Sequence, residues 1–163
     1  MKTLNLILAL IAFLMCGQVA ASEETPGSDW SIKQWNFATS IYTKHFDPEP
    51  DHNDSQNLIG VEMVFENDWI AGIAVFDNSF DQPSQLVFIG KTWPILSSPY
   101  WYFKLMGGLL HGYKEPYEDK IPFNGLGVAP AIVPALGLRY KRVYTEVNLA
   151  GAAAVTVNVG FSF

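Results

Sequence analysis

Three histidines and one serine are the residues of this chain best suited to proton transfer and nucleophilic chemistry. They are His45, His52, Ser79 and His111. A neutral imidazole can take the proton of a serine hydroxyl while the oxygen attacks a carbonyl carbon, which is the chemistry of acyl transfer. A lone histidine in a loop is more often a solvated polar residue. The chemistry therefore depends on whether the fold brings these side chains together.

The stretch around the first two histidines is also acidic. Asp47, Asp51 and Asp54 alternate there with His45 and His52. Such a set can ligate a divalent metal, but the spacing matches no strong metal-binding pattern, and a solvated acidic loop accounts for the same residues. We expect no metal and no cofactor. The sequence also lacks the Gly-x-Ser-x-Gly, phosphate-loop and His-Glu-x-x-His motifs.

The beginning of the chain has the features of a secretory signal peptide over residues 1–21. A positive N-terminus is followed by an apolar run over 6–15 and by small residues ahead of position 22. The apolar run is shorter than the roughly 20 residues that a membrane-spanning helix needs. Cleavage removes Cys16, the single cysteine, so we expect no disulfide in the mature domain, residues 22–163.

The composition suits a membrane β-barrel. The chain is 49% hydrophobic and 14% aromatic, with only 16% charged residues and a net charge of −6. An acidic protein binds nucleic acid poorly, and we expect no nucleic-acid partner. No segment after the signal peptide holds 18 uninterrupted apolar residues, so no helical span is predicted.

The C-terminal segment, residues 155–163, carries the clearest strand signal. Its odd positions are apolar and its even positions are small or polar, ending at Phe161 and Phe163. As the edge strand of a soluble sandwich it would expose a long hydrophobic edge, which soluble proteins avoid. It is similar to the terminal strand that outer-membrane barrels present to their assembly machinery, and we expect that machinery to be a partner.

Seven further strand-like segments precede it, bounded by turn residues. We therefore predict an all-β fold, an eight-stranded antiparallel transmembrane β-barrel, with a short amphipathic turn over 28–35 before the first strand. We expect a monomer in the outer membrane of a Gram-negative bacterium. The predicted strands are 35–46, 58–66, 69–77, 85–93, 100–112, 127–140, 143–149 and 155–163.

This topology assigns the connections to the two sides of the membrane. With both termini in the periplasm, the histidines and Ser79 all fall at the outer rim. Apolar residues on both faces of 70–76 and 86–89 indicate a partly apolar interior. The predicted outer loops are 47–57, 78–84, 113–126 and 150–154; the predicted inner turns are 67–68, 94–99 and 141–142. The predicted inner aromatic girdle is Trp69, Trp93, Tyr100, Trp101 and Tyr102.

The central segments resemble a known family. Residues 69–80 followed by 86–93 are similar to the central part of PagP-type lipid A palmitoyltransferases, which carry an Asp-Ser-aromatic step and then a Gly-rich strand ending in Trp. The proline-containing run 128–137 resembles their sixth strand. The resemblance covers about two-thirds of the mature chain at low identity. It implies an enzyme that moves a palmitoyl chain from a glycerophospholipid donor to a lipid A acceptor in the outer leaflet.

The resemblance also implies roles for individual residues. His45 matches the family's essential histidine, with His52 as the alternative base, and Ser79 matches its serine. Where the family has an aspartate this chain has Asn78. Either Asn78 contributes hydrogen bonds to a developing oxyanion, or Asp77 supplies the missing negative charge.

Three further residues acquire meaning from the resemblance alone. Gly90 matches the floor position that sets the acyl-chain length, and Pro130 and Pro134 match the weakly paired wall through which lipid enters laterally. Without the resemblance, the glycine indicates strand curvature and the prolines indicate bulges.

Two other functions stay open at this point. A non-catalytic small barrel serving adhesion, membrane integrity or small-solute transport has the same strand pattern. A lipid A deacylase has similar chemistry at its rim.

Overall fold

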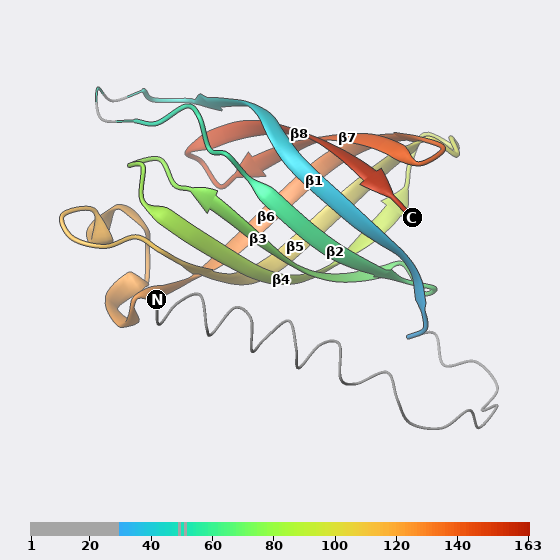
Figure 1. Ribbon diagram of the computed structural model, residues 1–163, viewed down its shortest axis with the longest axis horizontal. Helices are drawn as coiled ribbons and strands as arrows, with labels where there is room; N and C mark the ends of the chain where they lie inside the picture. Colours follow the sequence, from blue (N-terminus) through green and yellow to red (C-terminus); the bar gives the residue numbers. More distant parts are fainter. Residues whose placement is uncertain (1–29, 49, 51) are drawn as a thin grey trace.

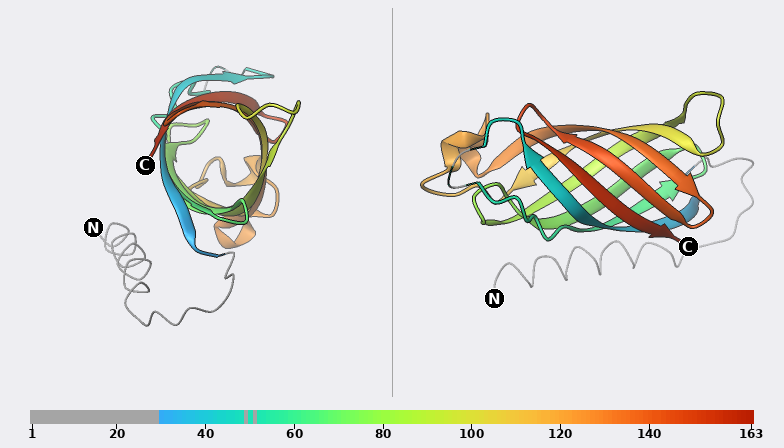
Figure 2. Two further views of the ribbon diagram at one scale, coloured as in Figure 1. Left: turned by 90° about the vertical axis from the view of Figure 1, so that its right-hand side faces the viewer. Right: turned by 90° about the horizontal axis from the view of Figure 1, so that it is seen from above.

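Eight antiparallel strands close into a single barrel in the computed structural model, each strand pairing with the next and β8 pairing with β1 (Figures 1 and 2). The structure describes residues 30–48, 50 and 52–163, so the predicted signal peptide, residues 1–21, lies outside it. Within these residues no helix is long and apolar enough to cross a membrane. The strands are β1 (Ile32–His45), β2 (Ile59–Phe65), β3 (Trp69–Asp77), β4 (Pro83–Pro94), β5 (Trp101–His111), β6 (Val128–Tyr140), β7 (Val143–Ala150) and β8 (Ala154–Ser162), with two 3₁₀ turns, η1 (Glu118–Lys120) and η2 (Asn124–Leu126), between β5 and β6.

The predicted fold class and strand number are confirmed, and the main correction concerns the N-terminus. The amphipathic turn expected over 28–35 does not form in its described part beyond Ser31, because β1 already begins at Ile32. Ile32 and Gln34 pair with β2, and the amide of Trp35 donates to the carbonyl of Phe163 at 2.9 Å. Backbone groups that find such partners favour the extended conformation over a helical turn.

The barrel has two different ends. The loop end carries the long connections 46–58, 78–82 and 112–127, whereas the turn end carries the tight turns 66–68 and 141–142 and the C-terminus (Figure 1). Between the two ends the outward face is apolar, as a bilayer requires and as soluble domains avoid. Its exposed side chains include Phe37, Val87, Ile89, Leu105, Leu109, Ile132, Leu136 and Val147.

The aromatic girdle predicted for the turn end is present with one exception. Trp93, Tyr100 and Trp101 are exposed on the outer face. Tyr102 instead points into the barrel and donates a hydrogen bond to Glu146 at 2.7 Å. Its hydroxyl finds a charged acceptor inside, which explains why this aromatic residue does not face lipid.

Buried charges cross the interior nearer to the turn end. Lys104 Nζ lies 2.9 Å from the carboxylate of Glu62 and 2.5 Å from that of Glu146, and all three side chains are almost fully buried. The amide of Asn36 donates a further hydrogen bond to Glu62 at 2.8 Å. A buried ion pair tolerates its desolvation only when its remaining hydrogen-bonding capacity is met, as it is here.

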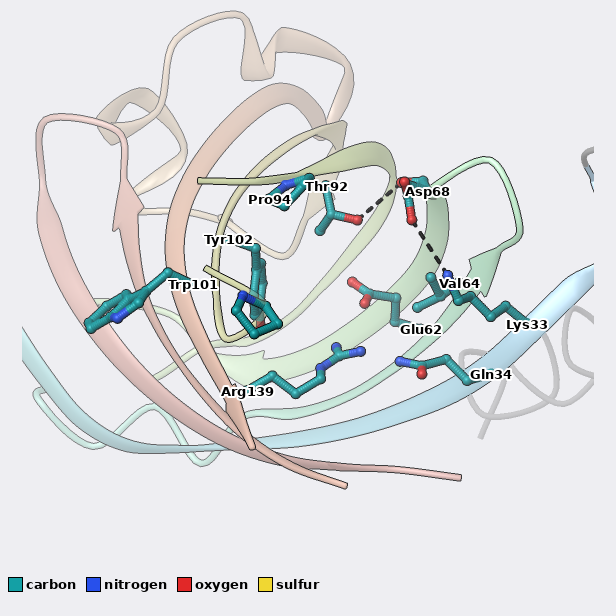
Figure 3. Close-up of a pocket in the computed structure, with 11 residues that line it drawn as sticks. Lys33, Gln34, Glu62, Val64, Asp68, Thr92, Pro94, Trp101, Tyr102 and Arg139 are labelled. Atoms are coloured by element: carbon teal, nitrogen blue, oxygen red, sulfur yellow. Dashed lines mark hydrogen bonds and ion pairs between the residues drawn. The ribbon is translucent and has the colours of Figure 1, made fainter. Parts of the chain in front are cut away.

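Arg139 completes this set of charges. Its guanidinium lies over the rings of Tyr102 and Tyr144, at 5.5 and 5.2 Å. Figure 3 shows Arg139 and Glu62 pointing into the pocket of about 220 Å³ at the turn end of the barrel. Two cations, Lys104 and Arg139, thus balance the two carboxylates of Glu62 and Glu146. We call these four residues the charge belt.

Candidate active site

A β-bulge in β1 determines which way His45 points. Opposite β8, Ser40 pairs with Asn158 and Tyr42 with Val157, so Ile41 is an extra residue in β1. Ile41 and Tyr42 both face outward, and the next inward positions are Thr43 and His45. Unbulged alternation from Ser40 would place His45 on the lipid face. The bulge therefore turns the imidazole into the loop end of the barrel.

Ser79 is held by a tight turn between β3 and β4. The side-chain oxygen of Asn78 accepts hydrogen bonds from the backbone amides of Phe80 (2.9 Å) and Gln82 (3.1 Å). Asn78 is fully buried, and its backbone amide donates to the backbone carbonyl of Gln82 at 2.9 Å. An Asx residue that mimics backbone acceptors in this way stabilises a turn. Asn78 fixes the position of the serine that follows it.

The structure brings His45, Ser79 and Asp54 into one chain of hydrogen bonds. Nδ1 of His45 lies 2.8 Å from Oδ1 of Asp54, and Nε2 lies 2.8 Å from Oγ of Ser79. A carboxylate only accepts, so the ring proton belongs on Nδ1, and Nε2 is left to accept the serine proton. This is the arrangement of a nucleophile, a general base and an orienting acid.

Asp54 is held in place by the residue before it. The backbone amide of Asn53 donates to the carbonyl of Ser79 at 2.7 Å, and its side-chain amide donates to Asp81 at 3.2 Å. The first outer loop is thereby attached to the turn that carries the serine. The hydrogen bond from His45 holds the pKa of Asp54 below its ordinary value of 3.8, so the carboxylate is charged near neutral pH.

In this chain of hydrogen bonds, the acidic partner of His45 is Asp54 rather than Asn78 or Asp77. Asn78 uses its side chain within its own turn, as described above. Asp77 continues the outward face of β3, and its Oδ2 accepts a hydrogen bond from Asn57 at 3.1 Å. Sequence reasoning noted Asp54 as one of several loop acids but did not connect it with Ser79, because the contact depends on the fold of a loop.

The two remaining histidines do not join the hydrogen-bond chain. The ring of His52 lies 4.3 Å from that of His45 and 5.3 Å from Phe80. His111, at the end of β5, donates from Nδ1 to the carbonyl of Gly127 at 2.6 Å. All three histidines do lie at the loop end, as expected from the strand order. Among the described residues no group of His, Cys, Asp and Glu side chains forms a metal site.

The connection between β5 and β6 packs against the turn that carries Ser79. The ring of Tyr117 stacks on that of Phe80 at 4.0 Å, and Lys120 lies over the same ring at 5.7 Å. The loop is fixed to the serine turn by Gln82, which accepts from the amide of Lys114 at 3.0 Å. Aromatic rings therefore pack beside the turn that carries Ser79.

A cavity of about 130 Å³ extends inward from this end of the barrel. Its walls differ in polarity. Leu58 and strands β2 to β6 supply mainly apolar side chains, including Phe76, Leu86, Phe88 and Val133, whereas β1, β7 and β8 supply Asn36, Asn148, Thr156 and Asn158. The interior is thus apolar on one side only, which agrees with the expectation of a partly apolar lumen. A layer of Val64, Ile70, Met106 and Ala135 packs in the interior.

Gly90 faces this interior but does not leave open space. It pairs with Ile70 on β3 and Met106 on β5, both of which are buried. A Cβ at position 90 would lie 2.3 Å from the carbonyl oxygen of Leu105 and 3.2 Å from Ile70 Cδ1. The glycine lets neighbouring strands and side chains approach closely. Gly90 is thus closely surrounded, and the floor position that the resemblance implies for it stays a prediction.

The wall is incomplete between β6 and β7. Their pairing runs from Tyr140 opposite Val143 to Ala135 opposite Asn148. Residues 128–134 of β6, which include Pro130 and Pro134, pair only with β5 in the part of the chain that the structure describes. Proline cannot donate a ladder hydrogen bond, so both residues suit a strand edge.

Comparisons with known proteins identify the fold and no family. No protein-family model matches the chain, and no curated protein matches it. A solved structure from the de novo design of transmembrane β-barrels superposes with a TM-score of 0.53 at 10% identity, covering 83% of this chain and 99% of the designed one. The Yersinia pestis outer membrane protein Ail, solved in a phospholipid bilayer nanodisc, gives 0.46 at 14% identity and covers 80% of this chain and 99% of its own. The designed barrel confirms that the fold is that of a transmembrane barrel.

Proposed function

We propose that this protein is a lipid A acyltransferase of the Gram-negative outer membrane, which transfers a palmitoyl chain from a glycerophospholipid in the manner of PagP-type enzymes. The observation that carries the proposal is the double hydrogen bond of His45, to Ser79 on one side and to Asp54 on the other. The apolar outward face of the barrel supports a membrane location, and the membrane is where such lipids are found.

The geometry supports a two-step reaction. Oγ of Ser79 attacks the carbonyl carbon of the donor ester while Nε2 of His45 takes its proton, and that proton then passes to the departing lysophospholipid oxygen. In the second step His45 removes the proton of a lipid A hydroxyl, whose oxygen attacks the acyl-serine carbonyl. Ser79 leaves and regains the proton. Asp54 stabilises the imidazolium that forms in each step.

The interior of the barrel has a surface that suits an acyl chain. The apolar wall of the cavity offers a surface for hydrocarbon, while the charge belt and the Ile70 layer limit how deep a chain can enter. The unpaired edge of β6 at Pro130 and Pro134 provides a lateral route from the bilayer into the loop end.

One observation favours a second function, deacylation of lipid A. The Asp54 side chain is 54% exposed although that of His45 is only 1% exposed, so water reaches the outer side of this hydrogen-bond chain. If water replaces the acceptor hydroxyl in the second step, the same residues hydrolyse the ester.

Mass spectrometry of lipid A tests these functions together. Cells expressing the wild-type protein should contain lipid A heavier by one acyl chain, and cells expressing Ser79→Ala should not. Loss of one acyl chain would instead establish the deacylase. An unchanged lipid A from both strains, with the wild-type barrel folded in the membrane, would contradict both enzymes and favour a non-catalytic barrel.

A further inference from the structure

A groove runs along the lipid-facing surface at the turn end of β6, β7 and β8. It is lined by Leu138 and Tyr140 of β6, Val143 and Thr145 of β7, and Val159 of β8. Tyr140 and Val143 are about 60% exposed, at 61% and 60%. The surface is far more apolar than polar and lies at the level of the aromatic girdle, since Tyr140 and Tyr100 are 6.0 Å apart.

Two cations close this groove at its turn end. Lys141 and Arg142 form the whole connection between β6 and β7, and both line the groove. Lys141 lies over the ring of Tyr140 at 5.4 Å. The ion pairs found within the described residues use other cations, so neither positive charge is neutralised by a carboxylate there. Phosphate groups of a membrane surface are the natural counter-charge at this depth.

The backbone of this turn adopts a conformation that is unfavourable for a lysine. Lys141 has φ of +56°, and the other described non-glycine residues with positive φ are Asn57, Asp68, Asp81, Leu96, Ser97 and Phe123. Two-residue hairpin turns prefer asparagine, aspartate or glycine in this region. A lysine followed by an arginine is a poor choice for turn formation alone, so the sequence here is explained better by what the side chains bind.

We propose that this groove binds one anionic glycerophospholipid of the inner leaflet. Lys141 and Arg142 hold the headgroup phosphate, and one acyl chain lies along Leu138, Thr145 and Val159. The proposal rests on the outer-membrane location proposed above but not on the acyltransferase activity. The site is at the opposite end of the barrel from Ser79, so its occupant is distinct from the lipids that would react there.

Native mass spectrometry of the refolded barrel tests the site. The protein is released from nanodiscs that contain equal amounts of phosphatidylglycerol and phosphatidylcholine with identical acyl chains. One basic residue near an anionic surface is worth about 1 kcal/mol, or about fivefold in binding, so two predict a preference of about thirtyfold for retained phosphatidylglycerol. The double variant Lys141→Gln/Arg142→Gln should reduce this preference to near unity.

A matched variant separates a site from general electrostatics. Lys33→Gln/Lys91→Gln removes two cations from the same end of the barrel and should leave the preference unchanged. A variant that fills the groove without changing charge, Val159→Trp, should reduce retention of both lipids. Equal loss of preference in the two double variants would overturn the site. In a second set of nanodiscs that contain equal amounts of lipid A and phosphatidylglycerol, stronger retention of lipid A would overturn the assignment to the inner leaflet.

Discussion

The imidazole of His52 packs against that of His45, with 4.3 Å between the ring centroids and an angle of 33° between the ring planes. His45 is the histidine that hydrogen-bonds to Ser79 and Asp54. This separates two histidines that the sequence offered as alternatives for the base. His52 packs against the base, and its ring limits how far the His45 ring can tilt away from the serine.

The first prediction therefore distinguishes the two histidines. His45→Ala and Ser79→Ala should each lower lipid acylation by about 10⁴-fold or more, because each removes a member of the hydrogen-bonded chain. His52→Phe, which keeps a ring in the same place, should retain most of the activity. Acylation assays on refolded protein measure all three, with heat-modifiable migration on gels as the folding control. Loss of activity in His52→Phe with an active His45→Ala would reverse the assignment.

The second prediction concerns Asp54 and pH. Its pKa is lowered by the hydrogen bond from His45, so the contact stabilises the folded state above the ordinary pKa of 3.8 and is lost as pH falls through the lower folded value. Asp54→Asn should therefore lower the melting temperature at pH 7 and have no effect near pH 2. Thermal unfolding of wild type and variant at both pH values checks this. An equal difference at both would show that charge is not involved.

The third prediction tests where an acyl chain lies. Ala74 is buried and lines the cavity, so Ala74→Met should exclude the last carbons of a long chain and favour shorter donors. Each CH₂ left unburied forfeits about 0.8 kcal/mol, or about fourfold in selectivity. Ala71→Met, on the lipid-facing side of the same strand, is the control and should keep the wild-type profile. Donors of graded chain length reveal the difference.

The fourth prediction is that Gly90→Met lowers the stability of the folded barrel rather than changing its acyl-chain selectivity. The new side chain would start 2.3 Å from a backbone oxygen of β5, and overpacking of this kind costs about 1–3 kcal/mol. Unfolding in urea measures the loss. A stable Gly90→Met barrel with a shortened chain profile would restore the floor position that the resemblance implied.

The fifth prediction concerns the charge belt. Lys104→Met leaves two buried carboxylates without their shared cation, and breaking a buried pair in this way costs about 3–5 kcal/mol. The triple variant Lys104→Met/Glu62→Gln/Glu146→Gln removes the carboxylate charges as well and should recover much of the loss. Urea unfolding of both variants against wild type tests the coupling. If the triple variant is destabilised further than Lys104→Met, so that the losses in the free energy of unfolding add, the three residues do not act as a unit.

The fold was readable from the sequence because membrane strands carry their own pattern. The alternation over 155–163 follows directly from a lipid-facing and an interior face, and β8 alternates in this way over Ala154–Ser162. The apolar runs over 70–76 and 86–89 also have a physical explanation, since β3 and β4 contribute to the apolar wall of the cavity as well as to the outer surface.

Only part of the site could be predicted from the sequence, because two of its determinants do not follow from the local sequence pattern. The side chain of His45 points inward because Ile41 is an extra residue in β1, and the sequence of the strand does not predict this bulge. The choice of Asp54 among the loop acids depends on the backbone contact between Asn53 and Ser79, which are 26 positions apart in the chain. Residues distant in sequence meet only once the loop is folded.

The charge belt has a consequence for the membrane as a whole. Lys104 is paired with two buried carboxylates, so its positive charge is neutralised within the protein. An ion that entered the lumen would have to shed its hydration beside an apolar wall and beside a lysine whose carboxylate partners are already engaged. The interior therefore offers an ion little compensation for the water it would lose, and we expect a low ionic conductance from a membrane that contains this barrel.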